Sequence, residues 1–266
     1  MESLIHRVYF SNGTHKKHSH YHDCYQIIFI LKGNVELCVN QAIYKAGAGD
    51  IAIFSRYEKH SLHAVSNEYE RYVLQINPST TAIESRIYSL FINRPKGFCN
   101  IIDVTNDTDF YKRQFDLIIN EQNSDNKMRN EMLKLLVNVL LIRIYRNLNN
   151  TSVFESEDAK TVYEIQKKME TNYWKNYSLK DIAKDYNISV SKISHTFKEI
   201  TGTSVMGHLL SCRMAAAQKY LAETNKSIGE IVEKCGFSDS SNFSRTFKKL
   251  NGISPSQFRK KYKTYN

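Results

Sequence analysis

The sequence predicts a protein of the α+β class with two domains, a β-rich N-terminal domain and an all-α C-terminal domain. Three observations lead to this prediction. The first ~100 residues hold short apolar runs between turn residues, the region from about Asp107 to Asn147 has helical periodicity, and the C-terminal part contains an internal repeat. A chain of 266 residues is long enough for two domains with a core each. We expect domains at 1–148 and 160–266, joined by a linker at 149–159.

The N-terminal domain is predicted to be an antiparallel barrel or a double-sheet roll. The runs YQIIFILKG and NVELCVN flank a turn at Gly33-Asn34, IYKAGAGDIAIF supplies two more short strands, and ERYVLQI supplies another. Many short strands at such spacing are typical of these two architectures. The stretch from Gly47 to Ala52 superficially matches a dinucleotide-binding fingerprint. It leads into the strand IAIF, however, whereas phosphate binding needs a helix at that place.

An apolar stripe marks the helical segment that follows the strands. Its members recur at helical spacing and are Leu133, Val137, Leu140, Ile144 and Leu148. The stripe either packs on the β-rich part or pairs with a second copy of itself, which would make a homodimer. The next segment, NLNNTSVFESEDAK, is poor in apolar residues and is predicted to be the linker.

The C-terminal part contains two copies of one pattern. SLKDIAKDYNISVSKISHTFKEITGTS begins at Ser178 and SIGEIVEKCGFSDSSNFSRTFKKLNGIS begins at Ser227, an offset of 49 that becomes 50 after one inserted residue near the turn. Each copy predicts a helix with a serine N-cap, a tight turn, a second helix and a stop at Gly202 or Gly252. This is the layout of a helix-turn-helix, whose second helix enters the major groove of DNA.

The second helix of each copy has an apolar face and a polar face. Ile193 and Phe197 in the first copy, like Phe243 and Phe247 in the second, are predicted to be core. Between the copies, SVMGHLLSCRMAAAQKYLAET predicts one long helix that holds the two units in a fixed relation. Two recognition helices roughly one DNA turn (~34 Å) apart can read consecutive major grooves from a single chain.

Positive charge is concentrated in this C-terminal part. The formal net charge is +10, but residues 1–159 hold 18 basic and 18 acidic side chains, so the whole excess lies in residues 160–266. A basic helix face is commonly only a solvated surface, but a charge excess confined to a repeated helix-turn-helix favours double-stranded DNA. A membrane is not expected as a partner, because the basic residues lie among turn residues and not along one continuous amphipathic helix.

The cysteine content and the hydropathy pattern predict a cytoplasmic protein. The five cysteines are far apart and form no CxxC, as expected for free thiols in a reducing cytosol. The first residues lack the basic start and the apolar run of a signal peptide. The most apolar window, Met132 to Tyr145, is too short and too polar to span a bilayer.

The second repeat resembles the AraC/XylS family of bacterial transcription regulators. The resemblance rests on IVEKCGFSDSSNFSRTFKKLNGISPSQFRK, together with Arg213, Ala217 and Leu221 in the linking helix, and covers roughly residues 160 to 263. The segments HYHDCYQIIFILKG and GDIAIFSRYEKH are similar to the cupin-type sensing domain common in that family. The resemblance implies a DNA-binding activator or repressor and not an enzyme. Its cupin-like barrel would bind a small-molecule effector such as a sugar, dimerise, or do both, and RNA polymerase would be a further partner.

The resemblance also implies which residues read DNA. The base-reading positions carried over from the family are Ser191, Ser194, His195, Ser241, Asn242, Ser244 and Arg245. The phosphate-binding positions are Lys192, Lys198, Lys248 and Lys249. Arg can hold guanine O6 and N7 with two hydrogen bonds and Asn can do the same for adenine, whereas Lys on a phosphate only sets position. Because a neutral His195 occupies the place of Arg245, we expect the second unit to supply more of the discrimination. Arg213 is predicted to be a packing or capping residue and not a base reader.

Four polar residues of the N-terminal domain are candidates for the effector pocket: His20, His22, Gln26 and His60. Metal-binding cupins place two His, a Glu and a third His at these positions, so a metal-dependent cupin enzyme fused to a DNA-binding module is the rival hypothesis. Two departures argue against a metal. Gln26 replaces the charged Glu, and Ser55 and Tyr57 replace the Pro and Gly that shape the second cupin motif. We therefore predict polar pocket lining or structural hydrogen bonding, with no metal and no cofactor.

Overall fold

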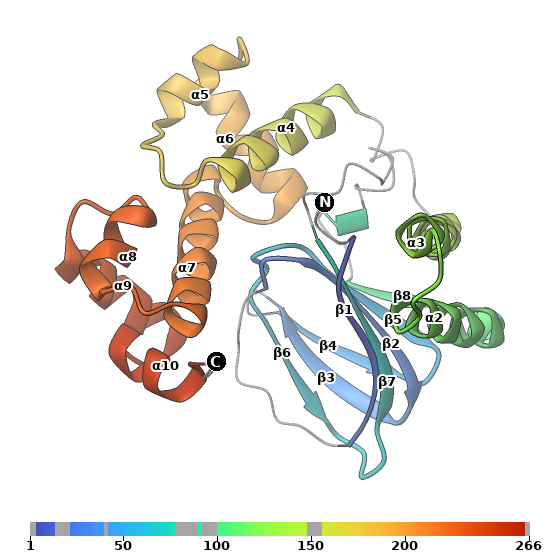
Figure 1. The fold of residues 1–266 in the computed structure, drawn as a ribbon. Coiled ribbons are helices and arrows are strands. Elements are labelled where there is room, and N and C mark those ends of the chain that lie inside the picture. The colour runs from blue at the N-terminus through green and yellow to red at the C-terminus, as the bar shows by residue number, and fades with distance from the viewer. Residues whose placement is uncertain are drawn as a thin grey trace. The chain divides into compact units, whose positions relative to one another are not determined.

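The computed structural model of the chain describes residues 4–13, 22–39, 42–77, 90–91, 100–147 and 156–263 (Figure 1). The chain divides into two compact units, Met1–Ser156 and Glu157–Asn266. The end of the predicted linker is helical instead, because residues 157–159 form the first turn of α4 (Glu157–Thr171). Glu157 and Asp158 lie in that turn, where acidic side chains interact favourably with the helix dipole. Residues 149–155 of the predicted linker lie outside the described residues.

The N-terminal unit contains two antiparallel sheets that enclose one core (Figure 1). Its strands are β1 (Ile5–Asn12), β2 (Tyr25–Lys32), β3 (Asn34–Val39), β4 (Ala42–Gly47), β5 (Asp50–Phe54), β6 (His60–Ala64), β7 (Glu70–Ile76) and β8 (Ile101–Asp103). The five-stranded sheet has the order β1-β7-β2-β5-β8, and the three-stranded sheet has the order β4-β3-β6. The predicted β-rich domain is confirmed, although the sequence patterns do not reveal β1, β6 or β8.

The core of this unit lies between the two sheets. Ile30 of β2, Leu37 of β3 and Leu62 of β6 are among the side chains that fill it. The predicted turn at Gly33 connects the two sheets and does not form a hairpin, because β2 and β3 do not pair. Gly33 has a φ of +84°, and a Cβ at this position would collide with the backbone oxygen of Glu68. Only glycine fits such a crossover without strain.

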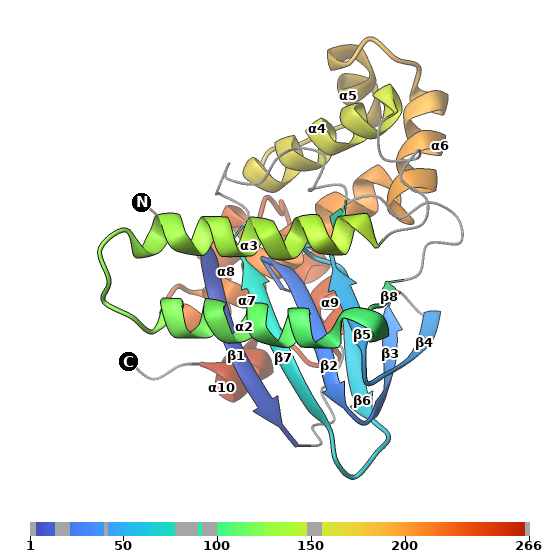
Figure 2. The same ribbon diagram turned by 90° about the vertical axis from the view of Figure 1, so that its right-hand side faces the viewer.

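Two helices, α2 (Thr108–Gln122) and α3 (Arg129–Arg146), cover the outer face of the five-stranded sheet (Figure 2). A short 3-10 helix, η1 (Thr105–Asp107), leads into α2. Phe115 of α2 stacks against Phe29 of β2 and Tyr72 of β7. The Tyr72 hydroxyl donates a 2.7 Å hydrogen bond to Asp116 of α2. This aromatic layer fixes α2 on the sheet and leaves α3 to pack on α2.

The apolar stripe predicted for the helical segment lies inside the N-terminal unit. Leu133, Val137, Leu140 and Ile144 are each at most 1% exposed. The alternative in which the stripe packs on its own domain is therefore confirmed. Pairing through this stripe is wrong, because the same chain already covers this face of α3. Leu148 lies outside the described residues.

The second unit is helical throughout its regular structure. After α4 it contains α5 (Leu179–Asp185), α6 (Val190–Thr201), α7 (Val205–Glu223), α8 (Ile228–Lys234), α9 (Ser240–Asn251) and α10 (Pro255–Tyr262). Ile193 and Phe197 belong to one core, and Phe243 and Phe247 belong to another. Residues of α7 contribute to both cores, so the predicted linking helix joins the two helix-turn-helix units (Figure 1). The predicted double helix-turn-helix is confirmed.

The backbone of the second unit repeats with the sequence. Asn187 and Gly236 close the turns of the two copies in the left-handed conformation, with φ of 52° and 73°. Gly202 and Gly252 end α6 and α9, with φ of 71° and 78°. Equivalent positions of the two copies therefore adopt the same left-handed conformation. Glycine adopts it easily, and asparagine adopts it less readily. None of the helices in the described part of the chain combines the length and apolarity needed to cross a membrane.

Candidate nucleic-acid interface

The first helix-turn-helix consists of α5 and α6. Ser178, the predicted N-cap of α5, accepts a hydrogen bond from the backbone N–H of Asp181. Ser189 does the same for α6, with the N–H of Lys192 as donor. A serine cap satisfies one of the N–H groups that have no partner at the start of a helix. Both helices therefore begin at residues that the local sequence defines.

The second helix-turn-helix consists of α8 and α9. Ser227, the other predicted N-cap, forms a capping box with Glu230. Asp239, which the sequence patterns do not single out, caps α9 by accepting from the backbone N–H groups of Ser241 and Asn242. These two hydrogen bonds hold the pKa of the Asp239 carboxyl below its usual range, with a smaller contribution from the charge of Arg245. The start of α9 is thus fixed by a carboxylate that stays ionised at neutral pH.

The predicted DNA-reading residues lie on the solvent side of α6 and α9. The exposed members are Ser191, Lys192, His195, Lys198, Ser241, Asn242, Arg245, Lys248 and Lys249. Ser194 and Ser244 are half-buried at equivalent positions of the two helices. The opposite face of each helix is buried in its own core. Both helices therefore present a polar face that no other part of the described unit covers.

The two exposed faces differ in charge. Helix α9 carries three basic side chains and no acidic one, whereas α6 carries two basic side chains and Glu199. Glu199 lies 3.6 Å from His195 Nε2, and Lys192 Nζ lies 3.0 Å from an oxygen of Asp158 on α4. Surface ion pairs of this kind are weak and can be exchanged for a phosphate. The α9 face nevertheless has the higher positive charge.

A joint around Arg213 of α7 holds the two helix-turn-helix units together. Its guanidinium donates to the carbonyl oxygens of Tyr173 and Lys175 at 2.8 and 2.9 Å and lies over the ring of Phe237. Burial lowers the pKa of Arg213, although its guanidinium stays charged at neutral pH. These contacts agree with a capping role for Arg213.

The backbone of Trp174 is the other half of this joint. It packs directly on Gly236, so that a Cβ at position 236 would lie 2.5 Å from the Trp174 carbonyl oxygen. The sequence patterns miss Tyr173 and Trp174, because their roles depend on contacts with Arg213 and Gly236, which lie 40 or more residues further along the chain. The turn between α8 and α9 is thereby fixed against the segment that follows α4.

The structure brings together three of the four candidate effector residues. His60 is 3% exposed; its Nδ1 lies 2.8 Å from the carbonyl oxygen of Glu58 and its Nε2 lies 3.0 Å from the Gln26 side chain. The rings of His22 and His60 are 5.2 Å apart. His20 lies outside the described residues.

This donor set does not fit a resident metal. Both ring nitrogens of His60 lie against protein partners, the Glu58 carbonyl oxygen and Gln26 Oε1, and Gln26 brings no charge. In the ranges that the structure describes, no three His, Cys, Asp or Glu side chains gather as a metal site. The geometry is that of structural hydrogen bonding inside the roll.

A second polar cluster lies near the same end of β2. Arg56, which is 8% exposed, forms an ion pair with Asp23 and lies over the ring of Tyr57. The Tyr57 hydroxyl lies 2.7 Å from the Arg56 guanidinium and donates to Asp23 at 2.5 Å. The sequence patterns single out Tyr57 only as a departure from the second cupin motif and do not predict its cluster with Asp23 and Arg56. Their hydrogen bonds compensate the burial of the Arg56 charge.

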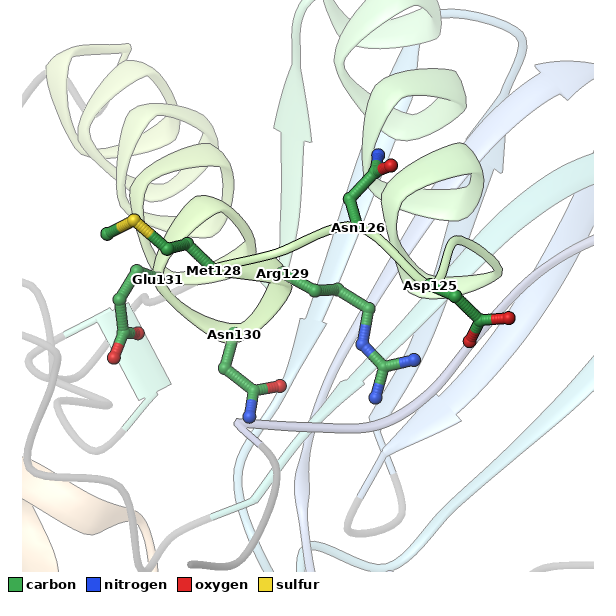
Figure 3. Close-up of a pocket in the computed structure, with 6 residues that line it drawn as sticks. All are labelled: Asp125, Asn126, Met128, Arg129, Asn130 and Glu131. Carbon is green, nitrogen blue, oxygen red and sulfur yellow. The ribbon is translucent and has the colours of Figure 1, made fainter.

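A hollow of 530 Å³ lies at the connection between α2 and α3 (Figure 3). Six neighbouring residues line it: Asp125, Asn126, Met128, Arg129, Asn130 and Glu131. Arg129 is already engaged, because its guanidinium donates to the carbonyl oxygen of Ser124 at 3.0 Å. Ligand pockets normally enclose the ligand with apolar walls from several elements, and one turn does not provide such walls.

Two family models match this chain. Residues 5–113 match the AraC-like ligand binding domain, and residues 182–261 match a helix-turn-helix domain. The first match contains β1 to β8 and the candidate effector residues, and the second contains all the predicted DNA-reading residues. The chain belongs to the AraC family of transcriptional regulators. It is a DNA-binding regulator with an N-terminal ligand-binding domain, as the sequence predicts.

Relatives of this AraC-family regulator match along nearly its whole length. The Msm operon regulatory protein of Streptococcus mutans is 29% identical over 90% of this chain and 84% of its own length. The transcriptional activator RhaR of Pectobacterium atrosepticum is 21% identical over 91% and 86%. A crystal structure of ToxT from Vibrio cholerae with a bound unsaturated fatty acid covers 97% of both chains, with a TM-score of 0.58 and 16% identity. The ToxT likeness shows the same fold.

Proposed function

We propose that this AraC-family regulator reads an asymmetric promoter site with α6 and α9, each in one of two adjacent major grooves. The base edges are read by Ser191, Ser194, His195, Ser241, Asn242, Ser244 and Arg245. The phosphates are held by Lys192, Lys198, Lys248 and Lys249. The observation that carries this proposal is the pair of exposed polar helix faces on two equivalent helix-turn-helix units. Hydrogen bonds from such faces to base edges specify sequence, and contacts to phosphate set the register.

The proposed function is tested by binding the purified chain to DNA fragments from upstream of its own and neighbouring genes at several salt concentrations. We expect tight, sequence-selective binding whose association constant falls steeply with salt, by about 0.9 logarithmic units per decade of salt for each neutralised phosphate. Four phosphate contacts alone would give a slope of about −3.6. Binding that is weak, indifferent to sequence and unchanged by added metabolites would contradict the proposal.

We propose that a small metabolite bound in the N-terminal unit controls this activity, with sugars as the first class to test. The AraC-like ligand-binding match at residues 5–113 supports an effector, and ToxT holds a fatty acid on the same fold.

We propose that the protein has no enzymatic activity, because the side chains of His60 and Gln26, two of the candidate metal ligands, are hydrogen-bonded to each other. Metal analysis of the purified protein tests this: near-stoichiometric Fe, Mn, Ni or Zn would favour the metal-dependent cupin enzyme. Such a regulator acts in the cytoplasm, where its promoter and RNA polymerase are.

We propose that the regulator is a homodimer that pairs through the outer face of α3. This face carries a second apolar stripe, whose members are Met132, Leu135, Val139 and Ile142. All four are exposed, from 38% for Ile142 to 63% for Leu135. Their spacing alternates between four and three residues, which is the heptad pattern of paired helices. A second copy of the same stripe would cover this face with matching side chains.

The double variant Leu135→Glu/Val139→Glu should be a monomer at concentrations where the unchanged protein is a dimer. A buried carboxylate without a partner costs several kcal/mol, so the dimer dissociation constant should rise by about 100-fold or more. Sedimentation velocity over a range of concentrations measures this. Leu117→Glu is the matched control, because Leu117 is 51% exposed on α2 and lies outside the stripe. A concentration-independent monomer for the unchanged chain would remove the homodimer.

A further inference from the structure

Arg71 points into the space between the two sheets of the N-terminal unit. Side chains along a strand alternate between its two faces. Tyr69 and Val73 belong to the core between the sheets, whereas Tyr72 contacts Phe115 of α2 on the outer face. Arg71 lies two residues from both Tyr69 and Val73, so its side chain is on the same face as theirs, and it is 4% exposed. Its charge therefore lies on the inner face of β7, in an apolar surrounding.

In the part of the chain that the structure describes, no anionic group pairs with the guanidinium of Arg71. Its neighbours across the sheet are Ser11 of β1 and Ile30 of β2. The central carbon of the Arg71 guanidinium lies 4.8 Å from the centre of the Tyr69 ring. Among the described residues, Arg71 Nη1 is buried without a hydrogen-bond partner, and no carboxylate forms an ion pair with Arg71. The Tyr69 hydroxyl is buried as well and interacts with Arg71 itself. Burial raises the pKa of Tyr69 to about 12, so its hydroxyl remains a donor at neutral pH.

A buried charge without a counterion is costly, and a contact with one aromatic ring returns only part of that cost. Arg56 shows the usual solution in the same unit, since its guanidinium is buried beside Asp23 and Tyr57. Arg71 is paired with Ile30 of β2, whereas Gln26, the hydrogen-bond partner of His60, lies four residues from Ile30 along that strand, about 13 Å away. The Arg71 group is therefore separate from the candidate effector residues that the sequence singles out.

We propose that the effector of this regulator carries an acid group, a carboxylate or a phosphate ester, which binds to Arg71 and accepts a hydrogen bond from the Tyr69 hydroxyl. The proposal rests on the proposed function, because it specifies the chemistry of the ligand in the N-terminal unit. An arginine fork matches both acid groups with two parallel hydrogen bonds. Binding of the acid would supply the counterion that the free protein lacks, so binding and the stability of the N-terminal unit are coupled.

The first test compares Arg71→Met with Arg56→Met by differential scanning calorimetry of the full chain without ligand. Methionine keeps much of the side-chain volume and removes the charge. We expect Arg71→Met to melt at least as high as the unchanged protein, with a rise of about 2–4 °C, because an uncompensated charge is removed. Arg56→Met should melt several degrees lower, because it leaves Asp23 without its partner. An equal loss for both variants would show that Arg71 is a structural residue and would overturn the proposal.

The second test adds glucose 6-phosphate, galacturonate, glucose or galactose to the full chain. We expect one of the two acids, and neither neutral sugar, to raise the melting temperature of the unchanged protein and to leave Arg71→Met unaffected. The phosphate and the carboxylate probes distinguish the two sources of the acid group. Equal responses of the two proteins to every probe, including no response, would overturn the acid class. DNA binding by Arg71→Met without ligand separates the two claims: if it is retained, the proposed function stands whatever the probes show.

Discussion

Gly236→Ala should destabilise the DNA-binding unit by about 2–5 kcal/mol, a loss large enough to unfold a marginally stable domain. Two costs add at this position. A left-handed φ of +73° is unfavourable for any residue with a Cβ, by roughly 1–2 kcal/mol. The new methyl group would also lie 2.5 Å from the backbone oxygen of Trp174, and backbone cannot move aside as a side-chain end can. Forced repacking of this kind costs about 1–3 kcal/mol.

Gly252→Ala is the matched control for this substitution. Gly252 has nearly the same φ, +78°, but nothing lies within 4 Å of the position where its Cβ would be. We expect it to cost only the conformational part, about 1–2 kcal/mol. Urea unfolding followed by far-ultraviolet circular dichroism measures both losses, and the fluorescence of Trp174, the single tryptophan, reports on the joint itself. Equal losses for the two variants would show that the contact with Trp174 does not hold the turn.

Arg245→Ala should cost more DNA-binding specificity than His195→Ala. The two residues occupy equivalent positions on α9 and α6, and both are exposed, so neither substitution removes a core contact. A guanidinium can hold guanine with two hydrogen bonds, whereas a neutral imidazole cannot form that fork, and Glu199 lies beside His195. We expect a loss of about 1–3 kcal/mol at one base position for Arg245→Ala, which is roughly 5- to 150-fold in affinity.

The measurement compares affinities of each variant for the cognate site and for sites with single base changes. Lys248→Ala serves as the control for a phosphate contact, because it should weaken binding to all sequences alike and reduce the salt slope by about 1. If His195→Ala relaxes specificity more than Arg245→Ala does, the first unit is the main reader and the assignment of roles must be reversed.

Local sequence determines most of the C-terminal unit. The serine caps at 178 and 227 and the stops at Gly202 and Gly252 can be read from the chain, because each acts within a few residues of itself. The joint at Arg213 cannot be read in the same way, since its partners at Tyr173 and Phe237 are set by the packing of distant segments.

The N-terminal unit is less readable from its sequence. β1 has mostly exposed or half-buried side chains and β6 has five residues, so neither has a clear apolar pattern without its partner strands. Periodicity finds the stripe from Leu133 to Ile144 but does not say whether the same chain or a second copy covers it. For the same reason ERYVLQI predicts a strand but not which side of it is inside, and the burial of Arg71 becomes visible only in the folded sheet.

The joint around Arg213 and Gly236 restricts which spacings of DNA sites this regulator can bind. Inserting one base pair between two half-sites rotates one relative to the other by about a tenth of a turn and moves it by about 3.4 Å. A flexible connection between the two helix-turn-helix units could adapt to such a shift. Here, however, α7 is one continuous helix, and the turn between α8 and α9 packs on the backbone at Trp174. Under the proposed reading of two half-sites, promoters of this regulator should therefore diverge by exchanging bases and keep the spacing between the half-sites constant.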